Sequence, residues 1–84
     1  MSDLELYHDA ILTVDLPADR LRAGDVGTIV ERHQVLGVAE VGYSVEFFDM
    51  TGRTVAVVTV PESKLRVPTS ADLPSVREVS ETPE

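Results

Sequence analysis

Cysteine is absent from this chain of 84 residues, and basic residues are few. The missing cysteine excludes disulfide bonds, thiolate nucleophiles and cysteine-based zinc sites. Lysine and arginine together number 7 against 15 aspartates and glutamates, which gives a formal net charge of −8. Non-specific binding to nucleic acid or to an anionic membrane depends on lysine and arginine. The charge therefore argues against both kinds of partner.

Long apolar runs are also missing from the chain. None approaches the roughly 18 residues of a membrane-spanning helix. Residues 1–7 carry acids and no basic cluster, so a secretory signal is not expected. The sequence predicts a soluble cytoplasmic protein, which without disulfides has to fold on a modest apolar core.

The chain divides at residue 67. Residues 68–84 hold four acids, one base and three prolines, and their apolar residues are isolated. Such a composition buries too little apolar area to offset the entropy of the chain. We expect a disordered acidic tail of net charge −3 after a folded domain, residues 1–67, of net charge −5. A tail that becomes ordered on a partner is the alternative.

Five short segments of the domain have the β-branched and apolar composition of strands. They are residues 10–14, 28–33, 43–49, 53–60 and 65–67. A long loop, residues 15–24, follows the first segment, and Leu16 and Leu21 are expected to pack it onto the domain. A one-turn helix is expected at residues 61–64, and residues 34–42 show no clear pattern. Five short strands close most economically as a small barrel or as two orthogonal sheets. The layout is SH3-like, so we expect an all-β fold, a small SH3-like β-barrel.

The second strand follows a turn signal, Gly24-Asp25-Val26-Gly27. Val26 and Ile29 are expected to pack inward. Gly27 is interpreted as a position whose backbone conformation a branched residue would not tolerate.

The hairpin that follows is the strongest local signal. Tyr43, Val45 and Phe47 alternate with the side chains of the opposite face, so the three are expected to point inward and Phe48 outward. Residues 49–52, Asp-Met-Thr-Gly, predict a type I turn with glycine in the left-handed conformation.

The returning strand, residues 53–60, is a dense β-branched run. It would be prone to aggregation at the edge of a sheet, although Arg53 and the Pro61-Glu62 pair flank it as gatekeepers. We expect a central strand with both faces covered, and self-association stays open.

Four blocks of the sequence resemble a family of small bacterial proteins known only as a domain of unknown function. The blocks are ILTVDLP at 11–17, LRAGDVGTIV at 21–30, the hairpin at 43–60 and LR at 65–66. The resemblance extends over residues 8–67 and implies an SH3-like fold with no catalytic residues to transfer. Such proteins resemble one half of a two-gene unit, which implies a partner, for example a toxin that the protein neutralises. Residues 24–31 also resemble the entry of KOW-type modules, which keeps a nucleic-acid or ribosome-associated role open.

Catalytic and metal-binding chemistry has little support in the sequence. The hydroxyl residues and histidines lie in no recognised nucleophile motif. His8 with Asp9 and the distant His33 provide too few ligands for a metal site. We expect no enzyme activity, no cofactor and no metal.

Binding to another protein is the function that the sequence favours. Phe48 is an aromatic residue on the outer face, next to Glu46 and Asp49, and Arg53 follows across the turn. Exposed aromatic side chains often anchor interfaces, and an acidic domain is steered towards a basic partner. Phe48, Glu46, Asp49 and Arg53 are the predicted contact residues of an antitoxin- or immunity-type inhibitor. Burial of Phe48 under residues 34–42 or in a homodimer, and a role as the accessory subunit of an enzyme, are the alternatives.

Overall fold

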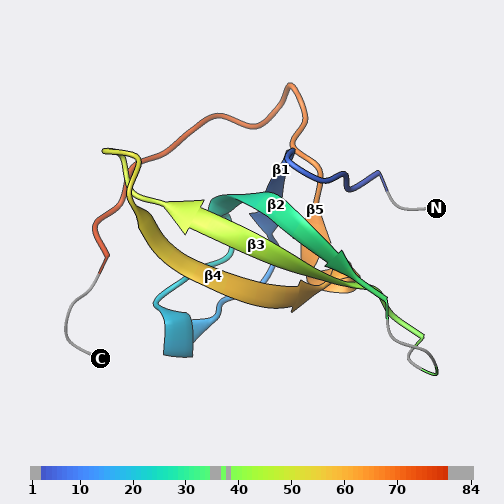
Figure 1. The fold of residues 1–84 in the computed structure, drawn as a ribbon. Helices are drawn as coiled ribbons and strands as arrows, with labels where there is room; N and C mark the ends of the chain where they lie inside the picture. The colour runs from blue at the N-terminus through green and yellow to red at the C-terminus, as the bar shows by residue number, and fades with distance from the viewer. Residues whose placement is uncertain (1–2, 35–36, 38, 80–84) are drawn as a thin grey trace.

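The β-branched segments form five antiparallel strands in one sheet, in the order β4-β3-β2-β1-β5 (Figure 1). This is a computed structural model, and it describes residues 3–34, 37 and 39–79. The strands are β1 (Asp9–Leu12), β2 (Val26–His33), β3 (Gly42–Phe48), β4 (Thr54–Pro61) and β5 (Leu65–Arg66). Within these described residues the chain also forms two single-turn 3-10 helices, η1 (Pro17–Asp19) and η2 (Glu62–Lys64). The predicted all-β fold of five antiparallel strands is confirmed, as one curled sheet whose edges are β4 and β5.

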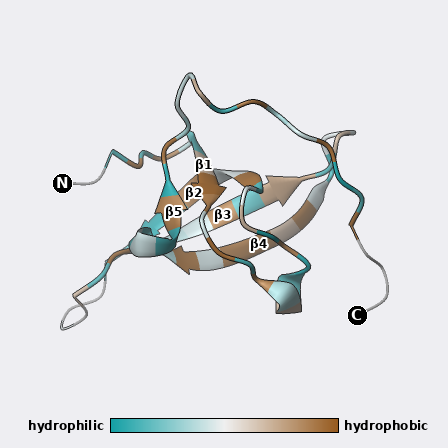
Figure 2. Cartoon of the chain, turned by 180° about the vertical axis from the view of Figure 1, so that it is seen from behind, coloured by the Kyte–Doolittle hydropathy of each residue, from teal (hydrophilic) through white to brown (hydrophobic). Residues whose placement is uncertain are grey.

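The apolar residues are concentrated in the strands (Figure 2), and the buried ones form one core cluster. Its buried members are Ala10, Leu12, Leu21, Ile29, Tyr43, Val45, Phe47, Val60 and Leu65. Leu21 reaches this core from the long loop, which an isolated bridge between Leu16 and Leu21 closes on itself. The predicted packing of that loop onto the domain is therefore confirmed.

The β3–β4 hairpin has the predicted alternation. Tyr43, Val45 and Phe47 are buried, and Phe48 is exposed. The turn closes with a hydrogen bond from the Gly52 amide to the Asp49 carbonyl, 3.0 Å. Gly52 has the left-handed φ of 90° that a residue with a side chain rarely adopts.

The central position predicted for the run at residues 53–60 is wrong. Its strand, β4, is paired on one side only, with β3, and forms an edge of the sheet. Val55 and Val57 on its outer face are 45% and 58% exposed. Composition alone did not distinguish an edge from a centre, because both kinds of strand favour β-branched residues.

Two expectations for the second strand also change. Val26 is exposed instead of packed inward, whereas Ile29 is fully buried as predicted. Gly27 has no unusual backbone angle. A Cβ atom there would lie 2.5 Å from Val45 Cγ1 and 2.9 Å from the Glu46 carbonyl oxygen. Glycine is required at this position by the close approach of β3, not by its conformational freedom.

The chain after β5 follows an extended path past the turn of the β3–β4 hairpin (Figure 1). Its beginning is held by Asp72, whose carboxylate accepts hydrogen bonds from both terminal nitrogens of Arg66, at 2.8 and 2.6 Å, and from the Thr69 amide at 2.7 Å. The expectation of a disordered tail at residues 68–84 stays a prediction, and residues 80–84 lie outside the described part. Val35, Leu36 and Val38 of the unassigned segment 34–42 also lie outside it.

Candidate protein-binding groove

A depression of the described surface lies beside the turn of the β3–β4 hairpin. It has a volume of about 500 Å³ and is bounded by the loop before β2 and by residues 73–79. We call it the hairpin groove. Its apolar lining side chains from the sheet and the hairpin turn are Val26, Phe47, Phe48, Met50 and Val55. An open apolar depression of this kind is a candidate contact site for another molecule.

Phe48 lies in this groove at the end of β3. The pairing of β3 with β4 shifts between Phe47 and Phe48, so that Phe47 opposes Ala56 while Phe48 opposes Thr54. Phe47 is buried in the core, and Phe48 is 44% exposed. The hairpin thus supports an aromatic ring that is partly covered and partly available.

Asp49 is another of the predicted contact residues, and it also lines the groove. Its Oδ1 accepts hydrogen bonds from the Thr51 amide at 2.8 Å, the Thr51 hydroxyl at 2.6 Å and the Arg53 amide at 3.0 Å. The hydrogen bonds from Thr51 and Arg53 lower the pKa of the Asp49 carboxyl below its usual value. Asp49 therefore stabilises the turn that carries Phe48, besides adding negative charge to the groove.

Glu46 and Arg53 lie near the groove but not in its lining. Glu46 is half-buried on the outer face of β3, and its carboxylate accepts a hydrogen bond from the Thr54 hydroxyl. Arg53 is exposed, and its backbone amide and carbonyl both bond to Asp49. The structure thus brings Phe48 and Asp49 together in the groove and leaves Glu46 and Arg53 beside it.

Two charged residues of the groove, Asp25 and Arg77, were not predicted from the sequence. Arg77 Nε donates to Asp25 Oδ1 at 3.0 Å, and its Nη2 bonds both to Asp25 Oδ2 and to the Arg20 carbonyl at 3.1 Å. The only sequence signal was a single base within an acid-rich segment. Asp25 itself was assigned to a turn, a role that it also has, because it accepts a hydrogen bond from the Arg22 amide at 2.8 Å.

The Asp25 carboxyl is the most enclosed charged group of the groove, with a side chain 19% exposed. Burial raises its pKa, but the hydrogen bonds from Arg77 and the Arg22 amide outweigh burial, so the pKa lies below its usual value. Asp15 adds negative charge that favours the charged form of Arg77. The Asp25 carboxylate and the Arg20 carbonyl thus provide acceptors that match the geometry of a guanidinium group.

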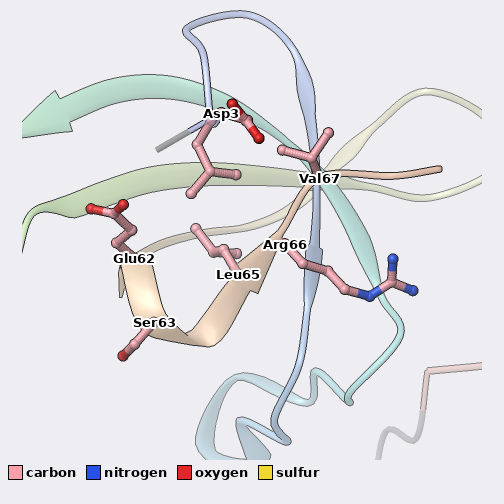
Figure 3. Close-up of a pocket in the computed structure, with 7 residues that line it drawn as sticks. Asp3, Glu62, Ser63, Leu65, Arg66 and Val67 are labelled. Atoms are coloured by element: carbon pink, nitrogen blue, oxygen red, sulfur yellow. The ribbon is translucent and has the colours of Figure 1, made fainter. Parts of the chain in front are cut away.

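Another depression, of about 380 Å³, lies between the N-terminal segment and β5 (Figure 3). Leu65 points into it, and the Arg66 side chain extends away to its ion pair with Asp72. Asp3, Glu62 and Ser63 add polar groups at its rim without a shared focus. It presents no arrangement that indicates a chemical step.

The two histidines have different surroundings. His8 lies 3.6 Å from a carboxylate oxygen of Glu5, and His33 Nε2 lies 2.7 Å from the Ser44 hydroxyl. Within residues 3–34, 37 and 39–79 there is no group of three or more side chains suited to hold a metal ion. The same part of the chain contains no helix long and apolar enough to cross a membrane.

Comparison with protein families matches residues 6–67 to the domain of unknown function DUF4926. The chain belongs to this family. The match confirms the resemblance inferred from the four sequence blocks, and it takes in all five strands of the DUF4926 domain, whereas Arg77 lies beyond it. No curated protein and no solved structure gives a match.

Proposed function

We propose that this DUF4926 domain is a non-enzymatic, cytoplasmic protein-binding module that contacts its partner through the hairpin groove. The partner is a basic protein encoded nearby, and the domain acts on it as an antitoxin- or immunity-type inhibitor. We also propose that the fold is SH3-like. The sheet order, the long loop after β1 and the 3-10 turn before β5 support that assignment.

The observation that carries the proposal is the position of Phe48. An aromatic side chain 44% exposed lies in a groove with further exposed apolar side chains, Met50 and Val55. Leaving such a cluster in water is unfavourable, and covering it with a partner removes that cost. Aromatic residues in partly enclosed positions are common anchors of protein interfaces.

The charge around the groove selects the kind of partner. Asp25 and Asp49 both line it against one base, Arg77, which pairs with Asp25, and Glu46 lies beside it. The chain as a whole carries −8. A basic partner is therefore attracted to this face over a distance of about one Debye length, roughly 8 Å at physiological salt. The effect of these charges is on the association rate and on selectivity.

The proposal is tested by capture with a tagged full-length chain at low salt. We expect one dominant basic protein, and we expect Phe48→Ala to weaken its binding about tenfold or more. Leu6→Ala is the matched control, because Leu6 is also 44% exposed but lies outside the groove. Circular dichroism of both variants verifies that the sheet is intact. Equal retention by Phe48→Ala and by the unmodified chain would reject the groove as the contact surface.

The inhibitory role needs a separate experiment. The product of the adjacent gene is expressed alone and together with the domain, and growth is measured. We expect the domain to restore growth and Phe48→Ala to restore it less. Absence of toxicity, or toxicity that the domain leaves unchanged, would reject the antitoxin role. Protein binding itself is tested separately, by the capture experiment.

A further inference from the structure

Residues 73–79 form one wall of the hairpin groove, and one side chain holds them there. Arg77 is 28% exposed and bonds to both carboxylate oxygens of Asp25. The contact joins residues 52 positions apart in the sequence. A guanidinium paired through two nitrogens with one carboxylate is a strong and directional contact.

The neighbours of Arg77 fill little of the apolar part of the groove. Leu73 is 85% exposed and Val76 is 74% exposed, although both line the depression. Phe48 and Val55 remain almost half exposed beneath them. Arg77 thus bonds to the Asp25 carboxylate and the Arg20 carbonyl, which together we call the charged corner of the groove. The segment leaves the apolar surface of the groove largely uncovered.

We propose that the hairpin groove is a binding site for an arginine-containing peptide segment and that Arg77 of the chain occupies its charged corner until a partner replaces it. The proposal rests on the proposed function and specifies its ligand. The partner segment places an arginine on Asp25 and a large apolar side chain against Phe48 and Val55, which the chain's own segment leaves exposed.

The chemistry of the corner selects arginine over lysine. Asp25 presents two oxygens to two nitrogens of one planar group, and the Arg20 carbonyl accepts a further hydrogen bond from the same guanidinium, at 3.1 Å. A lysine ammonium is a single point charge and does not reproduce this fork. Asp15 adds to the attraction for a cation.

Competition within the chain lowers the apparent affinity of the groove for the partner. A segment joined by a short linker has an effective concentration on the order of 1 mM. If Arg77 binds its corner with a dissociation constant near 100 µM, occupancy lowers the apparent affinity for a competitor about tenfold. Removing Arg77 restores the intrinsic affinity.

The first test concerns the segment itself. Backbone ¹⁵N relaxation of the full-length chain is measured for the unmodified protein and for Arg77→Ala, Asp25→Asn and Arg32→Ala. Arg32 is an exposed arginine on β2 for which the described part of the chain shows no ion pair, so its variant is the matched control. We expect residues 73–79 to gain fast motion in the first two variants only. Equal motion in all four proteins would overturn the proposal.

The second test uses a displayed library of short random peptides selected on full-length Arg77→Ala. We expect enriched peptides to carry one arginine near a large apolar residue. They should bind the unmodified chain about tenfold more weakly, bind the combined Asp25→Asn/Arg77→Ala variant least, and lose affinity when their arginine becomes lysine. The proposal would be overturned if no peptide is enriched, if the enriched peptides lack arginine, or if Asp25→Asn leaves their affinity for the Arg77→Ala chain unchanged.

The two proposals fail in different ways. If Phe48→Ala weakens capture of the cellular partner while Asp25→Asn and Arg77→Ala leave it unchanged, the groove binds a partner but not through an arginine, and only this inference is wrong. If Phe48→Ala also has no effect, the hairpin groove is not the contact surface, and the proposed function is wrong in that part as well.

Discussion

Replacing Gly27 by alanine tests the close packing of β2 against β3. A Cβ atom at this position would lie 2.5 Å from Val45 Cγ1, 2.9 Å from the Glu46 carbonyl oxygen and 3.0 Å from Phe47 Cδ1. Carbon atoms in contact are normally about 3.5–4.0 Å apart, so the methyl group is about 1 Å too close to the valine. Val45 is fully buried, and the carbonyl belongs to the backbone, so neither can easily move away.

The expected loss of stability follows from this overlap. Overpacking of a filled core costs about 1–3 kcal/mol. For a domain of this size, each kcal/mol lowers the melting temperature by about 4–8 °C, so Gly27→Ala should melt about 5–20 °C lower. Thermal unfolding followed by circular dichroism measures the shift.

Gly42→Ala is the matched control for this substitution. Gly42 also lies in a strand, but its added Cβ would approach nothing closer than Thr59 Cγ2, at 3.4 Å. Its melting temperature should change little or rise slightly, because alanine reduces the entropy of the unfolded chain. A Gly27→Ala variant that melts with the unmodified chain would show that the two strands are not packed as described.

The β-turn and the acidic side chains provide the remaining predictions. Gly52→Ala should cost about 1 kcal/mol, because Gly52 has a φ of 90° with open space around it, and urea unfolding will measure the loss. Asp49→Ala should lower the melting temperature through loss of the three hydrogen bonds to its Oδ1. The pKa values of Asp25, Asp49 and Asp72 are all lowered from the usual 3.8. Their contribution is therefore present above about pH 4 and is lost as the pH falls towards the lower folded-state values. Unfolding at a series of pH values should show stability declining below pH 4, with a smaller decline for Asp49→Ala; a flat profile would contradict the three contacts.

Local patterns in the sequence predicted the hairpin well. Alternation placed Tyr43, Val45 and Phe47 in the core, and the residue types at 49–52 predicted the turn, because both signals depend on near neighbours. The edge position of β4 was missed, because strand order depends on the partners that other segments choose. The pairing of Arg77 with Asp25 was missed for a related reason, since no local spacing reports a contact between residues 52 positions apart.

The candidate site shows the same division. Phe48 was placed on the outer face by alternation alone, and Asp49 beside it by its turn position. The groove around them depends on the loop before β2 and on residues 73–79, which reach the hairpin only in the folded chain. Sequence reasoning therefore placed Phe48 on the outer face correctly and did not predict the pairing of Asp25 with Arg77.

The ion pair between Asp72 and Arg66 has a consequence for the kinetics of the proposed partner binding. Asp72 keeps the start of the segment on the domain, and Arg77 follows it by only a few residues. A released Arg77 side chain therefore stays close to Asp25. Contact formation in a loop of about ten residues takes roughly 10–100 ns. Reclosing of a released Arg77 is then far faster than encounters between proteins. In the competition proposed above, the segment lowers the fraction of vacant grooves at any moment, and its reclosing adds no slow step to association.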